Sequence, residues 1–97
     1  MFFVRRTAEF DKWLKGLRDP IGKAKVAVRI ERLKVGNPGD VRPVGEGVSE
    51  LRIDFGPGYR VYYKQQGGLI YLLCGGDKGS QDIDVQKAAT LARGLKS

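Results

Sequence analysis

The chain has 97 residues, of which 41% are hydrophobic and 30% are charged, a composition that excludes a fibrous or wholly disordered protein. Eighteen Lys and Arg against eleven Asp and Glu give a net charge of +7, which favours an anionic partner such as nucleic acid, although a basic surface also serves solubility alone. With no histidine and a single cysteine, Cys74, the chain lacks Ser-His and Cys-His catalysis and the usual zinc ligand sets, and we expect no metal and no cofactor.

The length suits one domain over residues 1–97, since no linker, repeat or low-complexity tract divides the chain. The apolar start, Phe2 to Val4, is far shorter than the core of a signal peptide, and no apolar run approaches a membrane span. Cys74 lies in the apolar run LIYLLC, where a buried, inert thiol is the common outcome. We therefore expect a cytoplasmic protein without a membrane partner.

The first part of the chain predicts a strand and two helices. The strand covers 2–6, and apolar residues recur at helical spacing over 8–18 behind Thr7 as a possible N-cap. Asp19 and Pro20 are typical of the start of a second helix. Its inward stripe would consist of Val26, Ala27, Ile30 and Leu33.

The rest of the chain predicts a loop, three strands and a last helix. The segment 36–40, GNPGD, ends the second helix and leads to a loop around 41–47 that carries Arg42. The strands would cover about 49–55, 59–65 and 69–75. A helix follows Ser80, with an apolar stripe of Val85, Ala88, Leu91, Ala92 and Leu95. The predicted order is β-α-α-β-β-β-α.

Alternation along the strands sorts the residues of the sheet onto two faces. An apolar set including Leu51, Ile53, Val61 and Tyr63 fits the core, and a polar set including Arg52, Arg60, Tyr62 and Lys64 would face outward. A three-residue loop at 56–58 predicts the cross-strand pairs Asp54–Arg60, Arg52–Tyr62 and Glu50–Lys64. Ion pairs would then explain Arg60 and Lys64 structurally, whereas Arg52 would have no acidic partner and is the strongest candidate for a phosphate contact.

A glycine-rich loop at 75–79 follows the last predicted strand and carries Asp77 and Lys78. Such a loop is ordinary turn chemistry, and it matches no complete phosphate-binding fingerprint. Together with Arg52 and Arg60, however, Lys78 would complete a concave basic site. Asp77 either caps the turn or supplies an acid–base group.

The segment GEGVSELRIDFGPGYRVYY, then LIYLLCGGDKGSQDID and an amphipathic helix, resembles the RelE/ParE toxin superfamily, in particular its phage-derived, HigB-like addiction-module killer proteins. The resemblance covers nearly the whole chain, and its most specific parts are ELRI, GPGYRVYY and GGDK with the following Ser-Gln. It implies a RelE-like compact α+β fold, a small and mostly antiparallel sheet packed on helices. This is the order that the sequence pattern also predicts.

The resemblance further implies a toxin of a type II toxin–antitoxin system, a ribosome-dependent endoribonuclease that cleaves messenger RNA and is held by a cognate antitoxin protein. RNA supplies its own nucleophile, the 2′-hydroxyl, so the protein has to align it and stabilise negative charge, without a metal. The arginine of the GYR segment falls on Arg60, and Arg52 and Lys78 match neighbouring basic positions, with Lys78 as acid for the leaving oxygen. The expected RNA contacts are Lys64, Tyr62, Arg42 and Asp77.

The chain departs from the family pattern in its last element. Several ribosome-dependent members carry a tyrosine or histidine there for acid–base work, and the stretch SQDIDVQKAATLARGLKS has neither. Tyr62, Tyr71 or Asp77 would have to substitute. Two alternatives therefore stay open: a ParE-like, non-catalytic toxin that inhibits DNA gyrase by protein contact, and a non-toxic module of the same fold that binds nucleic acid or a partner.

Overall fold

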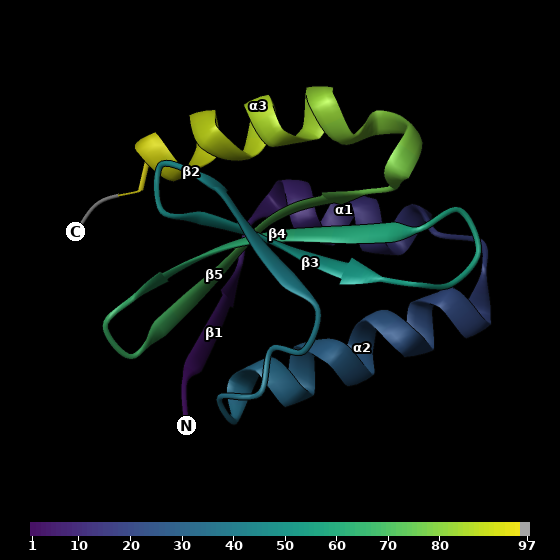
Figure 1. The fold of residues 1–97 in the computed structure, drawn as a ribbon, viewed down its shortest axis with the longest axis horizontal. Coiled ribbons are helices and arrows are strands. Elements are labelled where there is room, and N and C mark those ends of the chain that lie inside the picture. Colours follow the sequence, from purple (N-terminus) through teal and green to yellow (C-terminus); the bar gives the residue numbers. More distant parts are fainter. Residues whose placement is uncertain (96–97) are drawn as a thin grey trace.

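A five-stranded mixed sheet with helices on both faces forms the described part of the chain, residues 1–95 of this computed structural model (Figure 1). The elements are β1 (Phe3–Arg6), α1 (Ala8–Gly16), α2 (Pro20–Lys34), β2 (Val41–Gly45), β3 (Val48–Ile53), β4 (Tyr59–Gln66), β5 (Leu69–Gly76), a 3₁₀ turn (Lys78–Ser80) and α3 (Gln81–Arg93). The strands lie in the order β1-β5-β4-β3-β2. β1 runs parallel to β5, and the other neighbours are antiparallel, which confirms an α+β fold with a mostly antiparallel sheet.

The two N-terminal helices begin where their capping residues predict. The Thr7 hydroxyl accepts a 3.0 Å hydrogen bond from a backbone N–H in the first turn of α1, and the Asp19 carboxylate accepts one of 2.9 Å at the start of α2. Two details of the prediction are wrong, since α1 ends at Gly16 and not at 18, and Ala27 is exposed. The apolar face of α2 follows the narrower spacing of Val26, Ile30 and Leu33.

β2 is an element that the sequence pattern does not predict. Residues 41–47 were expected to form a loop, whereas Val41–Gly45 pairs with β3 at the edge of the sheet, with Val41 opposite Leu51. Pro43 lacks an N–H to donate, which an edge strand tolerates, and the register shifts between Pro43 and Gly45. Only two of its five residues are even partly buried. The alternation of apolar and polar residues is therefore too weak to identify this strand from the sequence.

The loop between β3 and β4 has five residues, 54–58, and not the predicted three. β3 ends at Ile53 because Phe55 turns back against the core, and its N–H donates to the Ile53 carbonyl at 2.9 Å. The predicted cross-strand pairs are therefore wrong, and those observed are Arg52–Arg60, Glu50–Tyr62 and Val48–Lys64. Since the shift is two residues and side chains alternate with a period of two, every residue keeps its predicted face.

Both faces of the sheet are covered, as Figure 1 shows for α2 and α3. The face toward α1 and α2 buries Phe10, Val26, Leu51, Val61, Ile70 and Leu72. The opposite face packs against α3 and buries Val48, Tyr62, Leu73, Cys74, Ala88 and Ala92. The prediction of an outward polar face is thus wrong at its centre, where Glu50, Arg60 and Tyr62 are buried.

A bulge in β5 lets both layers of helices approach this strand. Leu73 has no partner on β4, so Leu73 and Cys74 both pack in the core beneath α3. After the bulge, Gly75 lies beneath Trp13 of α1, and a Cβ at this glycine would overlap the indole ring. The lack of a side chain at Gly75 is therefore what allows α1 to sit against β5.

This packing gives a stability test. Gly75→Ala should lower the free energy of unfolding by about 1–3 kcal/mol, because the added methyl group must displace the Trp13 ring. Gly68→Ala is the matched control, since a Cβ there meets nothing within 4 Å. Urea denaturation of both variants measures the effect, and equal loss of stability in the two would contradict the packing described.

Candidate anion-binding site

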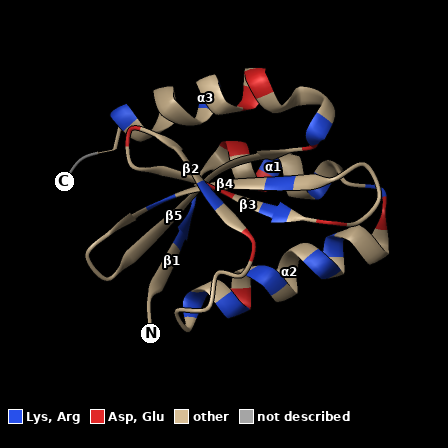
Figure 2. Cartoon of the chain, viewed as in Figure 1, with Lys and Arg blue, Asp and Glu red and all other residues tan. Residues whose placement is uncertain are grey.

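Arg52, Arg60 and Lys78, the three cations singled out by the sequence, line one open pocket of about 330 Å³. They come from β3, β4 and the turn before α3, and Figure 2 colours basic segments of the ribbon at these elements. The pocket is completed by Asp40, Asp54, Gly56, Pro57 and Gly58. The structure therefore brings the three cations that the sequence singles out to one pocket.

A buried carboxylate, that of Glu50, holds the two arginines at the pocket. Arg52 and Arg60 lie directly opposite each other on β3 and β4, a placement that is unfavourable for like charges on their own. The Glu50 Oε1 atom lies 3.7 Å from Arg52 Nε and 3.8 Å from Arg60 Nε. Because the Glu50 side chain is fully buried, its charge offsets the repulsion between the two guanidinium groups.

The other oxygen of Glu50 is held from two elements. Glu50 Oε2 accepts hydrogen bonds from the Tyr62 hydroxyl at 3.0 Å and from Gln81 Nε2 at 2.8 Å. Tyr62 belongs to β4 and Gln81 opens α3, so the carboxylate ties the sheet to the helix that covers it. Neither Glu50 nor Gln81 was identified as a site residue by sequence reasoning, which took the polar face for a solvent-facing one.

The β3–β4 loop brings Lys78 to the pocket. The Lys78 N–H donates to the Pro57 carbonyl at 3.4 Å, and Arg60 Nη1 donates to the Gly58 carbonyl at 3.3 Å. Gly58 has a φ of 81°, and a Cβ there would lie 3.3 Å from Lys78 Cβ and 3.5 Å from Arg60 Nη1. A glycine at this position thus allows the loop to pass between the two cations.

Two carboxylates at the rim, those of Asp40 and Asp54, also belong to the site. Arg29 of α2 fixes the segment with Asp40, since its guanidinium donates to the Arg52, Pro38 and Asp40 carbonyls at 2.5, 2.9 and 3.0 Å. Asp54 is exposed and does not form the predicted pair with Arg60. Sequence reasoning did not place Asp40 or Arg29 at the site, because the contacts depend on how α2 packs against the end of β3.

None of the four residues expected to contact RNA belongs to the lining of the pocket. Tyr62 is fully buried, so the expectation that it reaches a ligand or acts as an acid–base group is wrong. Burial raises the pKa of its hydroxyl far above the usual value, and the neighbouring Glu50 charge adds to this effect. Lys64 lies opposite Val48 and Arg42 is exposed on β2, and neither belongs to the lining of the pocket.

Asp77, the fourth of these residues, caps the turn before α3. Its carboxylate accepts a 2.8 Å hydrogen bond from the Gly79 N–H, and its own N–H donates to the Ser80 hydroxyl at 3.2 Å. This is the structural alternative that the sequence left open. Because the carboxylate is engaged in the cap, Asp77 is a weaker acid–base candidate than Asp40 or Asp54.

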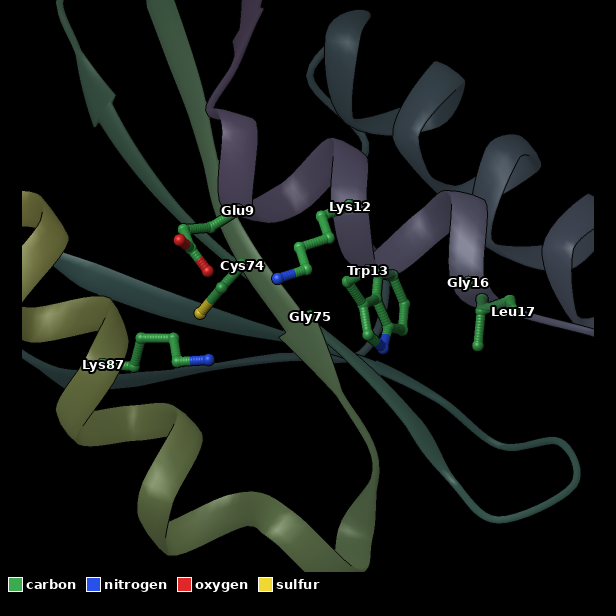
Figure 3. A pocket seen from close by; sticks show the side chains of 8 residues that line it. All are labelled: Glu9, Lys12, Trp13, Gly16, Leu17, Cys74, Gly75 and Lys87. Carbon is green, nitrogen blue, oxygen red and sulfur yellow. The ribbon is translucent and has the colours of Figure 1, made fainter.

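A second pocket, of about 370 Å³, lies between α1 and α3 and is lined by Lys12, Trp13, Cys74 and Lys87 among others (Figure 3). The Cys74 thiol is buried and donates to the Asp84 carbonyl at 3.7 Å. Burial raises the pKa of this thiol to about 12, with a further contribution from the Asp84 charge. The buried thiol is as predicted, and its pKa keeps it protonated and non-nucleophilic near neutral pH.

No family model matches this chain. It is similar to a protein of Haemophilus influenzae described as uncharacterized, with 52% identity over 93 residues that cover 95% of this chain and 94% of that protein. In the described residues, 1–95, no helix has the length and apolar character that crossing a membrane requires.

The environment of Cys74 gives a chemical test. At pH 8 the native protein should react with iodoacetamide far more slowly than the urea-unfolded protein, because the thiol returns on unfolding to a pKa of about 8.5. Mass spectrometry of samples quenched over time measures the two rates. Comparable rates in the native and unfolded protein would contradict the buried, protonated thiol.

The Glu50 network gives a second test. Tyr62→Phe should lower the free energy of unfolding by about 1–3 kcal/mol, because it removes one of the two hydrogen-bond donors to the buried Glu50 Oε2. Tyr71→Phe is the control, since Tyr71 lies on β5 and is not one of the two donors to Glu50 Oε2. A similar change in urea stability for both variants would show that the Tyr62 hydroxyl is not held by Glu50.

Proposed function

The chain belongs to the same family as the Haemophilus influenzae protein, and we propose that its function is to cleave messenger RNA as the toxin of a type II toxin–antitoxin system. The proposal takes the fold to be RelE-like, as the motifs ELRI, GPGYRVYY and GGDK suggest. It is supported by the α+β architecture and by the net charge of +7. The cognate antitoxin would be the protein that holds the toxin inactive.

The observation that carries this proposal is the convergence of Arg52, Arg60 and Lys78 on one pocket. A guanidinium group offers a planar set of donors that matches phosphate oxygens, and lysine adds a point charge. Arg52 is the more exposed of the two arginines that line the pocket, with 33% of its side chain exposed against 6% for Arg60. Arg52 and Lys78 therefore contact the scissile phosphate, and Arg60 acts beside them from the floor of the pocket.

The proposed reaction is the attack of the RNA 2′-oxygen on the adjacent phosphorus. The bond from the 2′-oxygen to phosphorus forms, the bond from phosphorus to the 5′-oxygen breaks, and a 2′,3′-cyclic phosphate and a 5′-hydroxyl result. Asp40 or Asp54 at the rim accepts the proton of the 2′-hydroxyl, and Lys78 donates a proton to the leaving oxygen. The cations stabilise the charge that builds up on the phosphate oxygens.

A second candidate is a non-catalytic toxin of the same fold that inhibits DNA gyrase by protein contact. Three observations favour it: no tyrosine among residues 1–95 lines the pocket, the chain has no histidine, and the Tyr62 hydroxyl is buried. The only groups of the pocket that could then transfer protons within residues 1–95 are the exposed carboxylates and one lysine. In a gyrase inhibitor, toxicity would not depend on the chemistry of Arg52 or Lys78.

Expression of variants in growing cells tests the proposal. The wild-type protein should arrest growth with new cuts in translated messages, and Arg52→Ala and Lys78→Ala should each slow cleavage about 10²–10³-fold, because each removes a cation from the charged transition state. Primer extension on selected messages measures the cuts. Lys87→Ala is the matched control, since Lys87 is an exposed lysine of a different pocket.

Arg60→Ala is a less informative variant for testing cleavage, because it would also affect folding. It would leave the buried Glu50 without one of its two cationic neighbours and thereby destabilise the fold. Growth arrest with intact messages and a DNA-damage response would reject the nuclease and support the gyrase inhibitor. Full cleavage by both Arg52→Ala and Lys78→Ala would reject the assignment of the pocket.

A further inference from the structure

The charges around the pocket point to a preference for one kind of phosphate. We propose that Glu50, Asp40 and Asp54 restrict this pocket to a phosphodiester within an RNA chain and disfavour a terminal phosphate. The inference rests on the proposed function, because it assumes that the pocket binds phosphate. It adds the class of phosphate that the site accepts.

The cations of the pocket are matched by carboxylates. Arg52, Arg60 and Lys78 line it together with Asp40 and Asp54, and Glu50 lies behind the two arginines. Within residues 1–95, the charged side chains that line the pocket and the buried Glu50 behind them are three positive and three negative groups. Arg29, whose guanidinium donates to the Arg52 and Asp40 carbonyls, adds one positive charge beside them. A ligand meets donors suited to phosphate, but it meets no large excess of positive charge.

Of the three carboxylates, Glu50 should have the largest effect on a bound anion, because water does not screen its charge. Its side chain is fully buried, and its Oε1 atom has no hydrogen-bond partner. Arg60 Nε, 3.8 Å away, is also buried and without a partner. Since the Glu50 charge is not dispersed by hydrogen bonds at Oε1, it acts on whatever anion approaches the two guanidinium groups.

The two kinds of phosphate differ in charge. A phosphodiester carries one negative charge, whereas a terminal monoester carries about 1.5 to 2 at pH 7, since its second pKa is about 6. The additional negative charge of the monoester is repelled by the Glu50 carboxylate behind the arginines and by the Asp40 and Asp54 carboxylates at the rim of the pocket. Free phosphate and mononucleotides should consequently compete poorly with an RNA chain, and the site is suited to internal linkages.

A matched pair of ligands tests the inference. We would titrate the protein with a 2′-O-methyl nucleoside 3′-phosphate and with the methyl ester of the same phosphate, and follow the pocket residues by NMR chemical shifts. The blocked 2′-oxygen prevents cleavage, and the two ligands differ by one methyl group and about one charge. The wild-type protein should bind the methyl ester about tenfold more tightly, as expected for a like-charge penalty on the monoester.

Variants identify the source of the preference. Glu50→Gln keeps the shape and an acceptor for Tyr62, and it should abolish or reverse the preference for the ester. Asp54→Asn, at an exposed position of the rim, should also reduce the preference for the methyl ester. If Glu50→Gln does not fold, the result for Asp54→Asn tests the inference. Glu31→Gln is the control, because Glu31 is exposed on α2 outside the pocket and its loss changes the net charge equally.

The outcomes separate this inference from the proposed function. Equal or tighter binding of the monoester by the wild-type protein would overturn the inference and leave phosphate binding intact. A preference that is unchanged in both Glu50→Gln and Asp54→Asn would also overturn it. No shift of pocket residues with either ligand would reject the phosphate site itself, and the inference with it.

Discussion

The buried Glu50 carboxylate is the interaction on which the rest of the site depends. It accepts hydrogen bonds from Tyr62 of β4 and Gln81 of α3, and it lies close to Arg52 and Arg60 on paired strands. Removing the carboxylate would leave two guanidinium groups opposed without compensation and would free the first residue of α3. The position of the cations and the start of α3 are therefore linked through one carboxylate, while the rest of the helix packs through apolar side chains.

The local rules of the sequence were enough to predict much of the fold. Capping by Thr7 and Asp19 identified the starts of α1 and α2, and alternation assigned the residues of β3 and β4 to their faces. The assignment survived an error in the length of the β3–β4 loop, because a slip of two residues preserves every face. For the same reason Arg52 and Arg60 were placed on one side of the sheet although both of their predicted partners were wrong.

What sequence reasoning missed depends on contacts between distant segments. The polar face was expected to be open, because alternation distinguishes two faces without showing whether the second is covered. Two signals point to covering by α3: the nearly continuous apolar runs VYY and LIYLLC, which are typical of strands buried on both sides, and the apolar stripe of the last helix, which needs a surface to pack on. With the face covered, Glu50 becomes a buried charge, and a charged residue at such a position indicates a role beyond packing.

The unusual polar groups of the protein gather at the pocket. Glu50 Oε1 and Arg60 Nε are buried without hydrogen-bond partners, which is unfavourable for stability, since buried polar groups are nearly always satisfied. A Gln at position 50 and an apolar residue at position 60 would relieve this cost, so stability alone does not explain the two charges. A fold that is locally consistent elsewhere but keeps opposed charges at one pocket is best understood if that pocket has a ligand to bind, and the donors held there are those that phosphate requires.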